Sequence, residues 1–483
     1  MGDKSRTGNK ILANLFWRYA ERCGAQLVQF IVSIVLARLI APEAFGTIAI
    51  VLVFTNLLQV FVDSGIGNAL IQKNDTDELD FSTVFYFNIL WCLLLYLVLY
   101  LAASPIASFY KDNSLIPVIR VLGLVIIISG LKNVQQAYVS KTLQFKKFFF
   151  ATLGGTLVSA IAGIALAIQG YGVWALVAQK LVNISIDTCV LYFTVKWRPK
   201  LLFSFERLKY LFGYAWKLLA SSLLDFLYLD FQQLIIGKLY SSSVLAFYSR
   251  GKQFPNLIVA NINTSIDSVL FPVMSMNQGN KKSVKAMLQM AIKTSTYIMA
   301  PLMIGLFVMA PTLISVVLTD AWLECVPFLR VFCLTYMFQP IHTSNMNSLK
   351  AMGRTDILLK IEVIKKIFCV SVLVVTMFIS VEAILIGLLA CSIVTQIINA
   401  WPNRRLLNYG YLEQLKDILP GILLAVFMGG CITPISLLSV SKYFILLIQV
   451  ISGGAIFIGV SALCKNETFM YLKNIAFGAS KKV

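Results

Sequence analysis

The sequence predicts an all-α polytopic membrane protein with about fourteen transmembrane helices. Hydrophobic residues make up 58% of the 483 residues, 13% are charged, and the mean hydropathy is +0.81. Soluble domains are less apolar and about twice as charged. Residues 81–110, 418–441 and 443–464 contain no charged side chain, and about 20 apolar residues suffice to cross a bilayer. The chain also consists of two similar halves, as described below.

The individual spans follow when the chain is divided at charges, glycines, prolines and polar turns. The first ten residues are polar and lead directly into the first span without a small-residue cleavage site, so we expect no cleavable signal peptide. The predicted spans are residues 14–38, 45–70, 83–105, 115–139, 148–168, 173–195, 211–236, 244–275, 287–318, 325–348, 357–379, 383–403, 417–438 and 443–464.

The distribution of basic residues predicts the orientation of these spans. With the N-terminus in the cytoplasm, nearly all loop lysines and arginines fall on the cytoplasmic side. The opposite side receives only Arg38, Lys111, Lys238 and Lys442. This asymmetry follows the positive-inside rule and would be lost if one helix were added or removed. We therefore expect both termini in the cytoplasm, and the net charge of +19 needs no nucleic-acid partner.

An internal repeat predicts the domain organisation. Residues 116–124, Ile-Pro-Val-Ile-Arg-Val-Leu-Gly-Leu, recur as residues 326–334, Val-Pro-Phe-Leu-Arg-Val-Phe-Cys-Leu. Each copy opens a predicted helix. We expect a six-helix lobe over residues 11–200, a second over residues 208–405, and two additional helices over residues 416–464. An even number of helices per lobe relates the lobes as parallel repeats, which alternating access can use.

Polar residues at helical spacing mark one face of four predicted spans. They are Arg18, Arg22, Gln26 and Gln29 on the first span, Asn56, Gln59 and Asp63 on the second, Lys217, Asp225 and Tyr228 on the seventh, and Arg250, Lys252, Asn256, Asn263 and Asp267 on the eighth. One interpretation is a water-filled, cationic central cleft whose arginines and lysines attract a diphosphate. The other is a set of snorkelling side chains and interhelical hydrogen bonds.

Metal chemistry is not expected from this composition. The nine cysteines are single and form no Cys-x-x-Cys pair, and His342 is the only histidine. Zinc and iron–sulfur sites need clustered ligands of these types. We therefore expect no metal site, no cofactor and no catalytic residue.

Several stretches resemble a known family of transporters. They are residues 36–46, Leu-Ala-Arg-Leu-Ile-Ala-Pro-Glu-Ala-Phe-Gly, residues 61–72, Phe-Val-Asp-Ser-Gly-Ile-Gly-Asn-Ala-Leu-Ile-Gln, and the shorter runs 117–122 and 144–147. The chain resembles polysaccharide-export (Wzx-type) flippases of the colanic-acid and teichuronic-acid exporter group, within the multidrug/oligosaccharidyl-lipid/polysaccharide superfamily. The resemblance implies transport of undecaprenyl-diphosphate-linked oligosaccharide to the outer leaflet of a bacterial inner membrane. The product would be O-antigen, capsule or exopolysaccharide, with a polysaccharide polymerase and a chain-length regulator as further partners.

The resemblance also implies roles for the polar stripes. Related lipid flippases carry basic residues on the first, second and eighth helices, and Arg18, Arg22, Arg250 and Lys252 match this by position. The second helix here departs from the pattern because it has no inward basic residue. With Lys217, these four residues are the predicted diphosphate contacts. The membrane potential or a proton or sodium gradient would drive the cycle, with Asp225 or Asp267 as the ion-coupling carboxylate.

Two alternatives remain open at this point. The first is a multidrug or small-solute exporter of the same superfamily, whose cleft would be less basic. The second is a membrane-embedded polysaccharide polymerase or ligase. That reaction needs a folded extracytoplasmic segment, whereas the predicted outward loops are short and His342 lies within a span.

Overall fold

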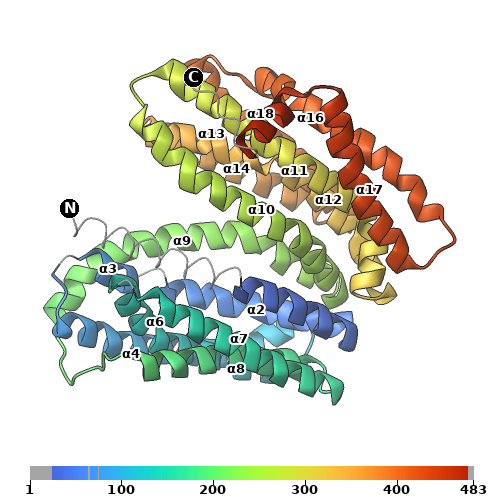
Figure 1. Ribbon diagram of the computed structural model, residues 1–483. Coiled ribbons are helices and arrows are strands. Elements are labelled where there is room, and N and C mark those ends of the chain that lie inside the picture. The colour runs from blue at the N-terminus through green and yellow to red at the C-terminus, as the bar shows by residue number, and fades with distance from the viewer. Residues whose placement is uncertain (1–23, 64–65, 74, 143, 477–483) are drawn as a thin grey trace. The chain divides into compact units, whose positions relative to one another are not determined.

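The structure, a computed structural model, describes residues 24–63, 66–73, 75–142 and 144–476 (Figure 1). The described residues form helices joined by short connections, without a β-strand. Eleven helices or runs of consecutive helices in this part are long and apolar enough to cross a membrane, and Gly24–Leu39 is a shorter apolar helix. The protein is therefore an all-α, multi-pass membrane protein.

The chain divides into two compact units, residues 1–246 and residues 247–483. Unit 1 contains, after the short helix, α2 (Pro42–Asp63), α3 (Ile66–Gln72), α4 (Glu78–Tyr110), α5 (Leu115–Leu122), α6 (Leu124–Lys141), α7 (Phe145–Ile168), α8 (Val173–Thr194) and α9 (Phe205–Leu239). Helix α10 (Ser242–Met276) crosses the boundary between the units.

Within unit 1, α7 and α8 pack along much of their length (Figure 1). Gly155 on α7 permits this close approach, because a Cβ atom there would lie 2.7 Å from the carbonyl oxygen of Asn183 on α8. Small residues at helix contacts are the usual means by which membrane helices pack. The contact fixes the position of α8, whose polar residues reach the cavity described below.

One end of unit 1 is held together by a buried carboxylate. Asp80, in the first turn of α4, is fully buried and lies 2.5 Å from Lys73 Nζ and 3.4 Å from Arg207 Nη1 on α9. The start of α4 is also capped, because Asp77 accepts a hydrogen bond from the Asp80 backbone N–H at 2.9 Å. This backbone hydrogen bond, together with Arg207 nearby, lowers the pKa of Asp77.

Unit 2 is built mainly on α11, which packs against α12 and α16 (Figure 1). Its elements after α10 are α11 (Lys281–Val317), the 3-10 helix η1 (Asp320–Cys325), α12 (Val326–Met337), α13 (Gln339–Ala351), α14 (Thr355–Thr376), α15 (Val381–Leu407), α16 (Tyr411–Ile432), the 3-10 helix η2 (Thr433–Leu437), α17 (Lys442–Leu463) and α18 (Glu467–Ala476).

A buried amide cluster joins α13, α15 and α16. Asn345 donates to Gln414 Oε1 at 2.9 Å, and its own oxygen accepts from Gln414 at 3.0 Å and from Asn403 at 2.7 Å. All three side chains are fully buried. Interhelical hydrogen bonds of this kind stabilise helix association where water is absent.

The predicted count of fourteen spans is not confirmed, although thirteen of the predicted spans coincide with one or two consecutive helices. The first, residues 14–38, is described only from residue 24. The spans at 211–236 and 357–379 correspond to α9 and α14, along which charged residues recur, and these are not among the eleven apolar spans. The predicted lobe boundaries of 11–200, 208–405 and 416–464 stay a prediction.

Candidate functional site

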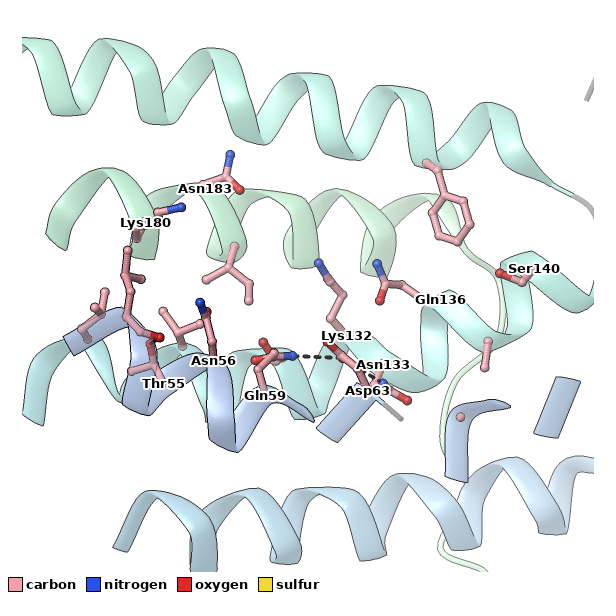
Figure 2. A pocket seen from close by; sticks show the side chains of 18 of the residues that line it. Thr55, Asn56, Gln59, Asp63, Lys132, Asn133, Gln136, Ser140, Lys180 and Asn183 are labelled. Atoms are coloured by element: carbon pink, nitrogen blue, oxygen red, sulfur yellow. Dashed lines mark hydrogen bonds between the residues drawn. The ribbon is translucent and has the colours of Figure 1, made fainter. Parts of the chain in front are cut away.

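Unit 1 contains a cavity of about 530 Å³ among its helices (Figure 2). We call it the unit-1 cavity. The α2, α3, α5, α6, α7 and α8 helices all contribute to its wall. The polar side chains that line it are Thr55, Asn56, Gln59, Asp63, Ser129, Lys132, Asn133, Gln136, Ser140, Lys180 and Asn183.

The contribution of α2 follows from its helical period. Asn56, Gln59 and Asp63 are three and four residues apart and therefore share one face. Gln59 donates to Asp63 Oδ1 at 2.9 Å. In Figure 2, Asn56 and Gln59 point from α2 into the space toward which Lys132 also points.

Asn133 on α6 ties the far end of α2 to the cavity wall. Its amide donates to the Val62 carbonyl at 3.1 Å and to Asp63 Oδ1 at 3.4 Å. Gly67 on α3 makes room for this side chain, because a Cβ atom at Gly67 would collide with Asn133 Oδ1. The Asp63 carboxylate is thus held by amide donors.

Lys132 and Asp187 form an ion pair between α6 and α8. Lys132 Nζ lies 2.9 Å from Asp187 Oδ2, and the two side chains are 17% and 9% exposed. The other carboxylate oxygen of Asp187 is buried and accepts no hydrogen bond within the described part of the chain. The pair connects two helices that would otherwise carry isolated charges inside the bundle.

Lys180 and Asn183, on α8, lie on the same face as Asp187. Asn183 is oriented by Thr156 and Ser159 of α7, whose hydroxyl oxygens lie 3.4 and 3.3 Å from its amide nitrogen. Lys180 is exposed at the cavity, and no described residue forms an ion pair or side-chain hydrogen bond with it. Its ammonium group is therefore available to an anion.

This arrangement suits a polar ligand that carries hydroxyl groups and a negative charge. Amides and hydroxyls both donate and accept hydrogen bonds, as sugar hydroxyl groups require. A lysine ammonium is a point-charge partner for phosphate. The volume is within the range of small-molecule binding sites.

Three of the predicted cavity residues, Asn56, Gln59 and Asp63, line the unit-1 cavity. Other predicted residues lie elsewhere or are not described. Arg18 and Arg22 lie outside the described residues. Gln26 is half-buried and Gln29 is exposed, and neither lines this cavity. Lys217, Asp225 and Tyr228 are positions of α9 whose side chains the structure does not describe.

The predicted residues of α10 lie outside the unit-1 cavity. Arg250 is buried, donates to Gln253 Oε1 at 2.6 Å and lies 5.5 Å from the centre of the Trp322 ring. Asp267 accepts from Asn347 of α13 at 2.6 Å. Lys252 and Asn263 are half-buried, and Asn256 is exposed. Their roles in binding diphosphate, lining a cleft or coupling an ion stay predictions.

Sequence reasoning missed the lysines of the cavity, Lys132 and Lys180, and the amides Asn133, Gln136 and Asn183. A signal for the lysines was present, because a charge within a membrane span usually faces a cavity. The pairing of Lys132 with Asp187 could not be predicted, because the two residues are 55 positions apart in the sequence.

The sequence is similar to proteins named for the biosynthesis of succinoglycan and of teichuronic acid. The succinoglycan biosynthesis transport protein ExoT of Rhizobium meliloti (strain 1021) is 22% identical over 348 residues, covering 72% of this chain and 70% of ExoT. The teichuronic acid biosynthesis protein TuaB of Bacillus subtilis (strain 168) is 27% identical over 307 residues, and the chain spans 63% of its length.

Solved structures show that the fold is shared. The lipid II flippase MurJ, in an inward closed conformation, matches with a TM-score of 0.74 at 14% identity, over 94% of this chain and 99% of that one. An inward-facing multidrug resistance MATE family transporter of the MOP superfamily matches with a TM-score of 0.61 at 14% identity, over 79% of this chain and 95% of that one.

A family model described as polysaccharide biosynthesis protein matches residues 35–327. This match includes more than half of the chain and all the helices that line the unit-1 cavity. The protein is therefore a member of the polysaccharide biosynthesis protein family.

Proposed function

We propose that the protein is a flippase that moves an undecaprenyl-diphosphate-linked oligosaccharide from the cytoplasmic to the outer leaflet of a bacterial inner membrane. The observation that carries this proposal is the unit-1 cavity, which offers amides, hydroxyls and a lysine that has no acidic partner among the described residues, inside a bundle of membrane helices. Membership of a polysaccharide biosynthesis family and the transport role in the name of ExoT support the same substrate class.

The cavity residues would divide the ligand between them. Asn56, Gln59 and Asn183 would meet sugar hydroxyl groups, and Lys180 would meet a phosphate oxygen. Lys132 would stay with Asp187 and keep the wall rigid. The polyprenyl tail would remain in lipid, because it has no polar group that gains from entering such a cavity.

We further propose that the cycle uses alternating access with both termini in the cytoplasm. Arg18, Arg22, Lys217, Arg250 and Lys252 are retained as the predicted diphosphate contacts. A membrane potential supplies roughly 2.3 kcal/mol per charge per 100 mV, so potential alone could bias the cycle. If a proton or sodium ion is coupled, Asp225 and Asp267 are its candidate carboxylates.

Multidrug export is the second candidate, because a multidrug transporter shares the fold. The lining of the unit-1 cavity favours the saccharide. Eleven polar or charged side chains, the two lysines included, would be expensive to desolvate against an apolar drug. A membrane polymerase is less consistent with a relative, ExoT, that is named as a transport protein.

The test is to delete the gene in its native host and to quantify the undecaprenyl-diphosphate-linked saccharides of the membrane by mass spectrometry, with their sidedness probed separately. We expect a complete repeat unit to accumulate on the cytoplasmic face while surface polymer is lost. Normal saccharide pools with a lost drug resistance would favour the exporter. Repeat units that reach the outer face but stay unpolymerised would favour the enzyme.

A further inference from the structure

Unit 2 has a cavity of its own, of about 560 Å³, at the junction of α11, α16, the end of α17 and the start of α18. We call it the unit-2 cavity. None of its lining residues takes part in the proposed transport function, and what it binds is independent of that function. Tyr297 lies in its wall, where it packs against Gly421 of α16 and donates to Ser461 of α17 at 2.7 Å.

The charges in this cavity are unequally compensated. Lys293 lies 3.1 Å from Asp417 Oδ1, and the Tyr409 hydroxyl donates to Asp417 Oδ2 at 2.8 Å. Both carboxylate oxygens of Asp417 therefore already have a partner. Lys416 and Lys465 are exposed at the cavity and form no ion pair or side-chain hydrogen bond with any residue that the structure describes.

The remaining carboxylate of the lining is Glu467, so the lysines outnumber the carboxylates by one. A phosphodiester carries one negative charge and would balance this excess. Lysine ammonium groups bind phosphate through charge-assisted hydrogen bonds, which are stronger than neutral ones.

The backbone at Lys465 is unusual for its residue type. Lys465 follows the C-terminus of α17 with a φ of +47°, a left-handed conformation that glycine adopts far more readily than lysine. The Lys465 side chain reaches the cavity alongside Lys416.

The other wall of the cavity is apolar. Pro420, Leu423 and Leu424 continue along α16 from Lys416, with Leu423 lying about 10 Å farther along the helix axis. Leu423 is 58% exposed, and its exposed neighbours Leu419, Val426 and Phe427 form a surface suited to lipid. Basic groups at the end of a span with apolar side chains beyond them match the headgroup and chain of a lipid.

We propose that the unit-2 cavity binds a membrane glycerophospholipid, with its phosphate between Lys416 and Lys465 and one acyl chain along Leu423 and Leu424. The bound lipid would contact α11, α16 and α18 and the end of α17, and so stabilise their packing. Glu467 would lie beside the headgroup and favour lipids whose headgroup donates hydrogen bonds.

The experiment is a titration of the delipidated, full-length protein with phosphatidylglycerol, read by native mass spectrometry. The variants are Lys416→Gln and Lys465→Gly. Glycine suits the backbone at residue 465, so a loss of binding there would not reflect misfolding. The matched control is Lys281→Gln, an exposed lysine at the start of α11 that does not line the cavity.

We expect the wild type and Lys281→Gln to retain one phosphatidylglycerol per chain. Lys416→Gln and Lys465→Gly should each bind phosphatidylglycerol about fivefold more weakly, because a lysine near an anionic headgroup contributes about 1 kcal/mol. The double variant Lys416→Gln/Lys465→Gly should bind it about 25-fold more weakly, because the two contributions add. Equal binding by all variants would overturn the proposal. Displacement of the lipid by an equal concentration of inorganic phosphate would also overturn it, because the site would then be one for a free anion.

Discussion

At the residue scale, the unit-1 cavity contains two lysines in contrasting surroundings. Lys132 is paired with Asp187 at 2.9 Å, whereas Lys180 is exposed at the cavity without an acidic partner among the described residues. Charged side chains within a membrane are retained where they meet a counter-charge or a hydrated space. The first lysine therefore stabilises the fold, and the second is available to the substrate.

Replacing Lys180 by glutamine should reduce transport without unfolding the protein. The variant loses one charge-assisted contact, worth about 1.5 to 3 kcal/mol, which corresponds to a fall in transport of roughly tenfold or more. Surface polymer in a complemented deletion strain measures the effect. Lys111→Gln, at an exposed lysine outside the cavity, should complement fully. Equal activity of both variants would remove Lys180 from the site.

Replacing Lys132 by glutamine should instead destabilise unit 1. Asp187 would keep a buried, unpaired carboxylate, and breaking a buried pair in this way costs about 3 to 5 kcal/mol. The double variant Lys132→Gln/Asp187→Asn should recover most of the loss, because both charges are then absent. The melting temperatures of the single and the double variant in detergent measure this difference. A double variant no more stable than the single variant would show that the pair is not the cause.

The helical period predicted that Asn56, Gln59 and Asp63 share one face of α2, and all three line the unit-1 cavity. Their place in a central cleft between the two lobes stays a prediction. Asn133 and Asn183 were missed because their roles depend on contacts between helices, such as that of Asn133 with Val62, 71 residues away. A single sequence carries no information on such pairs.

At the scale of elements, close approach and buried amides hold the helices together. Gly155 brings α7 against α8, and the cluster of Asn345, Gln414 and Asn403 joins α13, α15 and α16. Apolar burial alone contributes little to helix association in a membrane, because the lipid chains that a helix exchanges for a neighbouring helix are equally apolar.

The variant Gly155→Ala should separate α7 from α8 and destabilise the protein by about 1 to 3 kcal/mol, because the new methyl group has no space. Gly154→Ala is the control. A Cβ atom at Gly154 would meet no other atom within 4 Å, so this neighbour should be neutral or stabilising by up to about 1 kcal/mol. Thermal melting of the two purified variants compares them, and equal melting temperatures would contradict the predicted packing.

The variant Asn345→Leu should lower the melting temperature as well. Gln414 and Asn403 would each keep a buried amide without its partner, which costs about 1 to 3 kcal/mol per group. Retention of the wild-type melting temperature would mean that the cluster rearranges without loss.

The positions of the helices were largely predictable, because long apolar runs and charged loops mark them. Their interruptions were not all predicted. The span expected at 325–348 is divided into α12 and α13, and α13 begins with Pro340 next to its first residue. Proline has no N–H to continue the preceding helix, and a window of mean hydropathy does not detect this break.

At the scale of the whole molecule, the family and the chemistry of the unit-1 cavity favour the same class of substrate. The chain belongs to the polysaccharide biosynthesis protein family, and its unit-1 cavity has the polar lining that a saccharide needs. The fold by itself does not identify the substrate, because a lipid II flippase and a multidrug resistance transporter share it. A transport measurement is therefore needed to distinguish a lipid-linked saccharide from a drug as the substrate.

The most direct measurement is a flipping assay with the purified protein in liposomes. The liposomes would contain the lipid-linked saccharide identified in the deletion strain, and a membrane-impermeant reagent would modify the saccharides exposed outside. We predict that wild-type protein lets the reagent consume nearly the whole pool, while Lys180→Gln slows this and protein-free liposomes keep their inner pool. An inner pool that stays protected in the presence of folded wild-type protein would contradict the assignment as a flippase.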